Sequence, residues 1–314
     1  RYLRLKKRML GVETLKYSDL YAPVVKDVDL RYSFDEAKAL VLDAVRPLGP
    51  DYAGVVAKAL NERWIDVYPT PGKRSGAYSS GNAYDVHPYI LLNYNGQFDD
   101  VSTLAHELGH TMHSYYSNKN QPFPLADYSI FVAEVASTFN EQLVNALLLQ
   151  KATDKKTRAY LISREIDEIR GTLIRQTMFA EFEKIAHAIT EAGEPLTLER
   201  IRSEYRKLLE LYFGPDFALD ESLSLEGLRI PHFYHSFYVY KYATGISAAI
   251  TLARRVIEGG PKARDRYLNF LKAGGSKFPL DLLRDAGVDL TRPQPVATAM
   301  DRFKTLVGEL EELV

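Results

Sequence analysis

The stretch His106-Glu107-Leu108-Gly109-His110 decides both the fold and the chemistry expected of this chain. On a helix, the two histidines lie four residues apart on one face, roughly 6 Å apart along the axis at 1.5 Å per residue. At that separation two imidazoles can share one tetrahedral metal ion. Glu107 is next to the first histidine and can reach a water on the metal without binding the metal itself. The stretch therefore predicts a metal-binding helix that carries its own general base.

The surrounding residues have the pattern of a helix over residues 101–117. No proline interrupts it, and Asp99 and Asp100 stand before it as N-cap candidates. Apolar residues recur at helical spacing through it: Val101, Leu104, Ala105, Leu108 and Met112. The alternative, that both histidines are ordinary polar residues of a half-buried helix, has less support from the rest of the sequence.

A catalytic zinc needs a third protein ligand and an open position. In metzincins the third ligand is a histidine six residues after the second, and Tyr116 at that position excludes this class. His113 lies too far along the helix to close the same metal shell, so we expect it to support the ligands or to belong to the core. The next helix, expected over residues 128–149, carries only the acids Glu134 and Glu141. A carboxylate in so apolar a helix is costly to bury unless it is paired or metal-bound.

Several blocks of the sequence together resemble one family. They are HELGHTMH at 106–113, AEVASTFNE at 133–141, GKRSGAY at 72–78, PYILLNY at 88–94, RIPHFYH at 229–235 and GGS at 274–276. The sequence resembles the thimet-oligopeptidase family of zinc metallopeptidases, and within it the oligoendopeptidase F branch. The matches run along almost the whole chain, so we expect residues 1–314 to form the catalytic domain without the family's N-terminal helical region.

The resemblance implies a mainly α, zincin-like catalytic domain with a small β-sheet preceding the zinc-binding helix. It implies one Zn²⁺ per chain, held by His106, His110 and Glu134, with Glu141 as a supporting acid. The implied activity is endopeptidase cleavage of oligopeptides. One position departs from the thimet branch, which carries Asp three residues before the ligand Glu, where this chain has Phe131.

A second group of candidate residues follows Pro231. Because proline suits the first position of a helix, we expect a helix over residues 232–258 with His235, Tyr238 and Tyr242 on one face. The family resemblance implies that a His and downstream Tyr residues contact the reacting peptide, where donors can stabilise an oxyanion. Tyr240 competes with Tyr238 for one role. The alternative is that these tyrosines are core aromatics.

The segment between residues 65 and 98 is rich in glycine, tyrosine and β-branched residues, and we expect a small sheet there. Gly76 and Ala77 offer unobstructed backbone to a substrate that adds a strand, although Gly76 also suits a tight turn. A capping box at Ser33 and Glu36 precedes another expected helix. The remaining expected helices cover residues 37–45, 51–63, 155–191, 198–213, 262–273, 280–285 and 296–313.

Composition limits the remaining choices. A net charge of −1 gives no long-range attraction to nucleic acid or anionic lipid, so we expect neither as a partner. The absence of cysteine leaves histidine and carboxylate as zinc ligands and agrees with a cytoplasmic protein. The sequence does not fix the oligomeric state. Two other functions remain open: a zinc carboxypeptidase, which needs a cationic pocket, and a peptide-binding module with an inert metal site.

Overall fold

The computed structural model describes residues 1–26 and 28–314. The chain divides into two compact units. Unit 1 comprises Arg1–Val28, Asp154–Thr244 and Arg302–Val314, and unit 2 comprises Asp29–Thr153 and Gly245–Asp301. Among the described residues, no helix combines the length and the apolar character needed to cross a membrane.

Unit 2 is a set of helices around α4 and α6, which pack along each other. Its helical elements are α2 (Phe34–Ala44), the 3₁₀ turn η2 (Arg46–Leu48), α3 (Pro50–Asn61), α4 (Phe98–Asn120), α5 (Phe123–Ala126), α6 (Ile130–Lys151), most of α10 (Tyr240–Lys272), α11 (Pro279–Ala286) and the start of α12 (Gln294–Leu313). α10 is broken at Gly260, whose φ of 63° is left-handed, directly before Pro261. The sequence predicts this break between 258 and 262.

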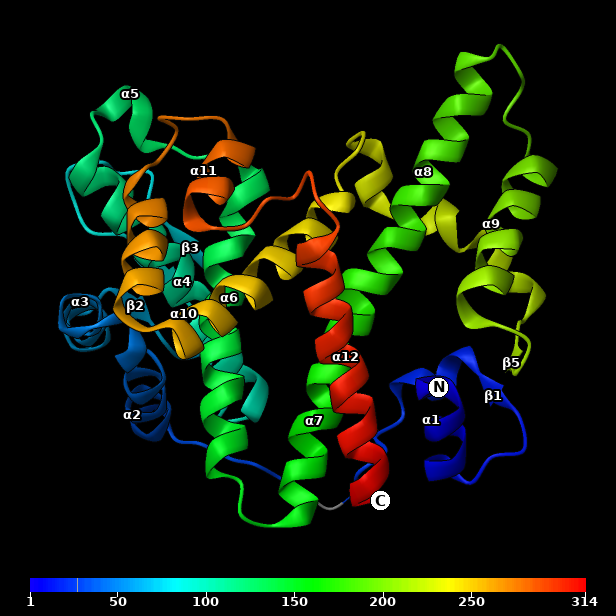
Figure 1. The fold of residues 1–314 in the computed structure, drawn as a ribbon, viewed down its shortest axis with the longest axis horizontal. Helices are drawn as coiled ribbons and strands as arrows, with labels where there is room; N and C mark the ends of the chain where they lie inside the picture. Colours follow the sequence, from blue (N-terminus) through cyan, green and yellow to red (C-terminus); the bar gives the residue numbers. More distant parts are fainter. Residues whose placement is uncertain (27) are drawn as a thin grey trace. The chain divides into compact units, whose positions relative to one another are not determined.

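A small sheet precedes α4 in the chain and lies beside it (Figure 1). Its strands are β2 (Ile65–Asp66), β3 (Tyr78–Ser80) and β4 (Tyr89–Leu91), in the order β2-β4-β3. β4 runs parallel to β2 and antiparallel to β3. The Ser79 hydroxyl shares a hydrogen bond of 2.8 Å with Thr111 of α4, which fixes the edge strand β3 against the helix. The predicted mainly α fold with a small sheet before the histidine-bearing helix is confirmed.

The ends of α4 differ from the sequence prediction. The helix begins one turn earlier than expected, with Gln97 as its N-cap, so the prediction of Asp99 or Asp100 as the cap is wrong. Asp100 instead accepts hydrogen bonds from the backbone N–H groups of Gln97 and Asn95, at 2.9 and 2.8 Å. A carboxylate in the first turn is favourable because the helix dipole is positive there.

Unit 1 is also mainly helical. Its elements are α1 (Tyr2–Leu10), β1 (Leu15–Lys16), η1 (Tyr17–Tyr21), α7 (Lys155–Ile169), the π-helical turn η3 (Arg170–Ile174), α8 (Arg175–Glu191), α9 (Leu198–Phe213), β5 (Phe217–Ala218), η4 (Glu221–Arg229) and η5 (Pro231–Tyr234). The first residues of α10 and the C-terminal part of α12 also belong to unit 1. β1 pairs in parallel with β5. Figure 1 shows α8 and α9 as a hairpin of helices.

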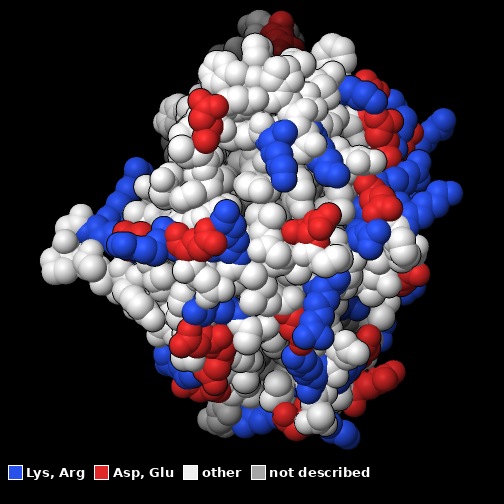
Figure 2. Space-filling model, turned by 90° about the vertical axis from the view of Figure 1, so that its left-hand side faces the viewer, with Lys and Arg blue, Asp and Glu red and all other residues white. Residues whose placement is uncertain are grey.

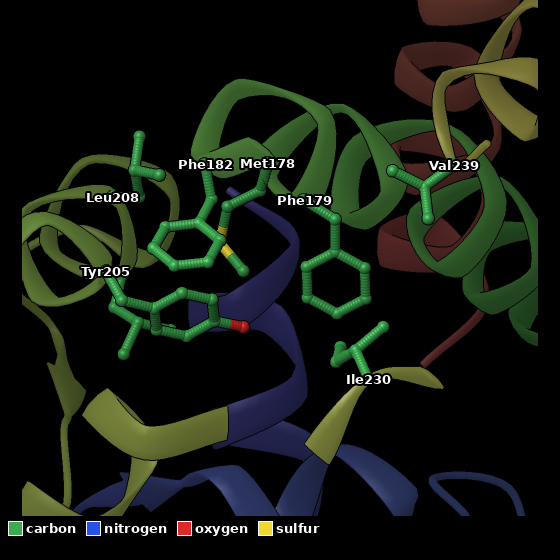
Figure 3. Packing of buried hydrophobic residues seen from close by; sticks show 8 residues of the cluster. Met178, Phe179, Phe182, Tyr205, Leu208, Ile230 and Val239 are labelled. Atoms are coloured by element: carbon green, nitrogen blue, oxygen red, sulfur yellow. The ribbon is translucent and has the colours of Figure 1, made fainter. Parts of the chain in front are cut away.

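The core of unit 1 joins this hairpin to the chain that follows it (Figure 3). Phe182 of α8 and Tyr205 of α9 meet edge to face, with ring centroids 5.0 Å apart. Ile230 and Val239 extend the same cluster and are 9% and 1% exposed. Each such buried side chain contributes about 1.5–3 kcal/mol relative to exposure, so the segment between residues 230 and 239 is anchored at both ends.

Candidate metal centre

Three side chains of unit 2 converge on one point. His106 and His110 lie one turn apart on α4, and Glu134 is the fifth residue of α6. Glu134 Oε2 is 3.3 Å from His106 Nε2 and 3.4 Å from His110 Nε2. The three donor atoms all lie within 4.8 Å of one another. Two helices thus bring together residues that are 28 positions apart in the chain.

The chemistry and spacing of these donors fit a zinc ion. Two imidazole nitrogens and one carboxylate oxygen form a common catalytic zinc ligand set. Ligand atoms about 2.0 Å from a tetrahedral centre lie about 3.3 Å from each other. The two measured distances from Glu134 Oε2 match that edge length.

A second carboxylate orients His106. Glu141 Oε1 is 3.4 Å from His106 Nδ1 and accepts a hydrogen bond from the Ser102 hydroxyl at 3.3 Å. A carboxylate on the outer nitrogen of a metal-ligating histidine fixes the tautomer and the ring. Burial lowers the pKa of His106, but its hydrogen bonds to Glu134 and Glu141 outweigh burial and raise that pKa to about 10. The carboxylates at both ring nitrogens thus favour a positive charge at His106.

The contacts with the histidines also shift the pKa of Glu134. Burial raises its pKa, but hydrogen bonds from His106 and His110 outweigh burial and hold the pKa below its usual range. Its Oε2 also accepts a hydrogen bond from the Ser137 hydroxyl at 2.9 Å. The carboxylate is therefore held in its charged form, as a metal ligand must be.

Glu107 faces the same space without joining the three donors. Its side chain is 6% exposed, and its Oε2 is a buried oxygen without a hydrogen-bond partner among the described residues. Burial raises the pKa of Glu107. A buried carboxyl of this kind beside a metal site has the properties of a proton acceptor.

These residues line a cavity of about 690 Å³. Ser114 and Asn118 continue the i+4 row of His106 and His110 along α4 into its wall. The sequence prediction did not include them, although their spacing marks the same helix face. The other described residues of the wall are Ala77, Tyr78, Ser79, Gly81, Asn82, Tyr84, Glu107, Phe123, Ala126, Asp127, Tyr128, Ile130, Ala133 and Glu134.

The predicted strand-addition residues lie directly before β3, which begins at Tyr78. Ala77 lines the cavity, and Gly76 precedes it with a left-handed φ of 88°. The Asn93 side-chain amide donates to the Gly76 carbonyl at 2.8 Å. Gly76 therefore makes the turn that its residue type allows. β3 itself is an edge strand, so its outer backbone groups face away from β4.

His113 lies in the core. It is 1% exposed and stacks on Tyr128 with ring centroids 3.7 Å apart. Burial lowers its pKa to about 3, so its ring is neutral. Of the two roles expected for His113, supporting the ligands or belonging to the core, the structure therefore shows the second.

The structure contradicts the predicted helix after Pro231. Residues Pro231–Tyr234 form the short 3₁₀ helix η5, and α10 begins only at Tyr240. Phe237 interrupts the expected helix because its φ is 57° and its backbone N–H donates to Glu183 at 2.6 Å. A left-handed bulky residue is uncommon and ends a helix. The prediction that His235 and Tyr238 share a helix face with Tyr242 is therefore wrong.

Within unit 1, Tyr238 and Tyr242 still lie together, with ring centroids 5.7 Å apart. The histidine beside them is His232, whose Nε2 is 3.4 Å from the Tyr242 hydroxyl. His235 is exposed. The sequence prediction chose His235, from the family resemblance and from helical spacing, and did not include His232. The metal-donor residues belong to unit 2 and these residues to unit 1.

Comparison with known proteins gives the family. Residues 3–302 match the model of peptidase family M3. The oligopeptidase PepF of Bacillus subtilis is 47% identical over 314 residues, which is 100% of this chain and 47% of that protein. An oligoendopeptidase F homolog of Borreliella burgdorferi is 45% identical over 99% of this chain and 53% of its own length. The chain thus spans about half the length of the curated relatives it matches.

Solved structures agree. A Chlamydophila abortus protein assigned as a peptidase superposes with a TM-score of 0.93 at 42% identity, over 100% of this chain and 52% of its own. The oligoendopeptidase-F of Enterococcus faecium gives a TM-score of 0.77 at 36% identity, over 99% and 49%. Family membership implies a metal ion, and His106, His110 and Glu134 are the donors that the geometry offers. The chain belongs to peptidase family M3.

Proposed function

We propose that this chain carries the catalytic machinery of a zinc-dependent endopeptidase that cleaves internal bonds of oligopeptides. One observation carries the proposal: three zinc-type donors lie within 4.8 Å of one another in a cavity that also contains the buried Glu107. In this proposal His106, His110 and Glu134 hold one Zn²⁺, and Glu141 orients His106.

Each residue then has a defined task. When bound, zinc supplies Lewis acidity to a carbonyl and acidifies water. Glu107 accepts the proton of the attacking water and later delivers it to the leaving amine. His235, Tyr242 and Tyr238 are the donors that the family resemblance offers for the oxyanion, and His232 joins them because it contacts Tyr242.

The substrate is proposed to be an oligopeptide bound in extended form along β3, next to Gly76 and Ala77. An edge strand binds a peptide through main-chain hydrogen bonds and so tolerates many side chains. The position of β3 at the sheet edge and of Ala77 on the cavity wall supports this mode.

A carboxypeptidase has less support. It needs a cation for the substrate's terminal carboxylate, and no Lys or Arg is among the described residues of unit 2 that line the cavity. Arg229, the arginine nearest in sequence to the second candidate group, pairs with the buried Glu226 at 2.8 Å. A cytoplasmic location stays a prediction from the absence of cysteine.

The test combines metal analysis with cleavage of a peptide blocked at both ends. We expect one zinc per chain, lost in Glu134→Ala and retained in Glu141→Ala with weaker binding, since loss of a residue that orients a ligand costs about 10–100-fold in affinity. We expect internal cleavage of the blocked peptide. Zinc retained by Glu134→Ala at wild-type affinity would refute the ligand set. Zinc binding without cleavage would favour the peptide-binding module, and cleavage only of peptides with a free C-terminus would favour the carboxypeptidase.

A further inference from the structure

The crossing of α4 and α6 is unusually close beside the proposed metal ligands. Gly109 lies between His106 and His110 on α4, and the backbone of α6 occupies the space where its side chain would be. A Cβ on Gly109 would lie 2.6 Å from Ser137 Cα and 2.8 Å from the Ala136 carbonyl carbon, and nearer still to the Ala136 oxygen. Such contacts are far inside van der Waals separation, so any larger residue would force the helices apart.

Ser137 lies three residues after Glu134 on α6 itself, and its hydroxyl reaches the proposed ligand. Ser137 is fully buried, and its Oγ lies 2.9 Å from Glu134 Oε2 and 3.1 Å from the Glu134 carbonyl. Glu134 Oε2 is the oxygen that faces both histidines. One turn further along α6, the Asn140 amide donates to the Ala105 carbonyl at 3.2 Å, next to His106. The register of the two helices is thus fixed on both sides of the ligand set.

We propose that Gly109 and Ser137 are positioning residues that set Glu134 at ligand distance from His106 and His110. This inference rests on the proposed metal site. Gly109 fixes the separation of the helices, and Ser137 fixes the direction of the Glu134 carboxylate through a hydrogen bond to its ligating oxygen. Neither residue touches the metal or the substrate.

The test measures metal affinity in variants that change one feature each. Gly109→Ala adds the obstructed methyl group, and Gly54→Ala is its control, because Gly54 lies inside α3 with no atom within 4 Å of its Cβ position. Ser137→Ala removes the hydroxyl. Its control is Ser163→Ala in α7, because Ser163 is also buried and bonds its own helix at the Tyr160 carbonyl, 2.8 Å away.

Zinc affinity is measured by competition with a chromophoric chelator, with circular dichroism to verify folding. We expect Ser137→Ala to bind zinc about 10–100-fold more weakly, and Gly109→Ala at least about tenfold more weakly. Both controls should stay within about threefold of the wild type. Visible spectra of the cobalt(II) proteins provide a second measurement, because they report coordination geometry. We expect them to change in the two variants and not in the controls. If Gly109→Ala does not fold, Ser137→Ala decides the outcome, since it only deletes one oxygen atom.

Two failures are distinguishable. If the wild type binds no zinc, or if Glu134→Ala binds it as tightly as the wild type, the proposed metal site itself is wrong. If Glu134→Ala loses zinc while folded Gly109→Ala and Ser137→Ala keep wild-type affinity and cobalt spectra, only the positioning role is wrong. Lower stability with unchanged metal affinity would identify both as packing residues and would also overturn the inference.

Discussion

Glu107 and His113 lie on the same helix and show how their surroundings give two titratable side chains different properties. Both are almost fully buried. Glu107 opens onto the cavity beside the three donors, whereas His113 is enclosed between Tyr128 and Phe270. Burial favours the neutral form in both cases, raising the pKa of Glu107 and lowering that of His113. Only Glu107 has space in front of it for a water and a peptide.

The role of Glu107 can be tested without disturbing the metal. In Glu107→Gln we expect zinc content and thermal stability close to wild type, because the residue neighbours the ligands and is not one of them. Peptide hydrolysis should fall by about 10²–10⁴-fold, the usual cost of losing a general base. The measurement is the initial rate on a blocked peptide together with metal analysis. Glu62→Gln, on the surface of unit 2, is the control and should keep full activity. Activity of Glu107→Gln within about threefold of wild type would exclude this residue as the base.

At the scale of elements, sequence periodicity predicted helices well where packing and pattern agree. The range 198–213 is found as α9, and the capping box of Ser33 and Glu36 starts α2. The expected helix over 155–191 is present, with a π-helical turn at Arg170–Ile174 that no periodicity indicates. The ends of helices were predicted less accurately than their existence. Gln97 caps α4 where Asp99 or Asp100 was predicted, because a cap depends on backbone geometry.

The break at Phe237 could not be predicted from local sequence. It depends on Glu183, which is 54 positions earlier in the chain and accepts the Phe237 N–H. His187, also on α8, lies against the Phe237 ring at 4.5 Å. A tertiary anchor thus overrides the helical preference that Pro231 suggests. The metal donors were more predictable, since His106 and His110 are set by one helical turn.

The segment that contains this break is proposed to supply oxyanion donors, which predicts a kinetic effect. Tyr242→Phe should lower kcat about 10²-fold, comparable to the loss of one oxyanion donor, with little change in KM or thermal stability. A tyrosine that served only the core would instead lose about 1 kcal/mol of stability and keep its kcat. Tyr242 packs at the edge of the unit 1 core and contacts His232, so both outcomes are physically possible.

Parallel variants separate the neighbouring residues. Tyr238→Phe and Tyr240→Phe decide which of the two tyrosines acts with Tyr242, and His232→Ala and His235→Ala do the same for the histidines. We expect kcat to fall for one residue of each pair. Full turnover in all of these variants and in Tyr242→Phe would remove the whole segment from the mechanism.

At the scale of the whole molecule, the two units are discontinuous in sequence. Unit 1 is assembled from three separate stretches of the chain, and two of the unit boundaries fall within α10 and α12. No linker or composition change marks them, so the sequence predicts one domain over residues 1–314, and this stays a prediction. Acidic and basic side chains are interspersed over the face drawn in Figure 2, as expected for a net charge of −1.

Metal binding should therefore stabilise the two units unequally. All the proposed ligands belong to unit 2. A ligand that binds only the folded state adds about 4 kcal/mol when its concentration is a thousand times its Kd. On chelation we expect amide hydrogen exchange to accelerate in α4 and α6, while α8 and α9 of unit 1 keep their protection. The measurement is hydrogen exchange read by mass spectrometry, with and without chelator. Glu134→Ala is the control and should exchange rapidly in α4 and α6 without responding to chelator. Equal loss of protection in α8 and α9 would instead mean that the two units open as one cooperative body.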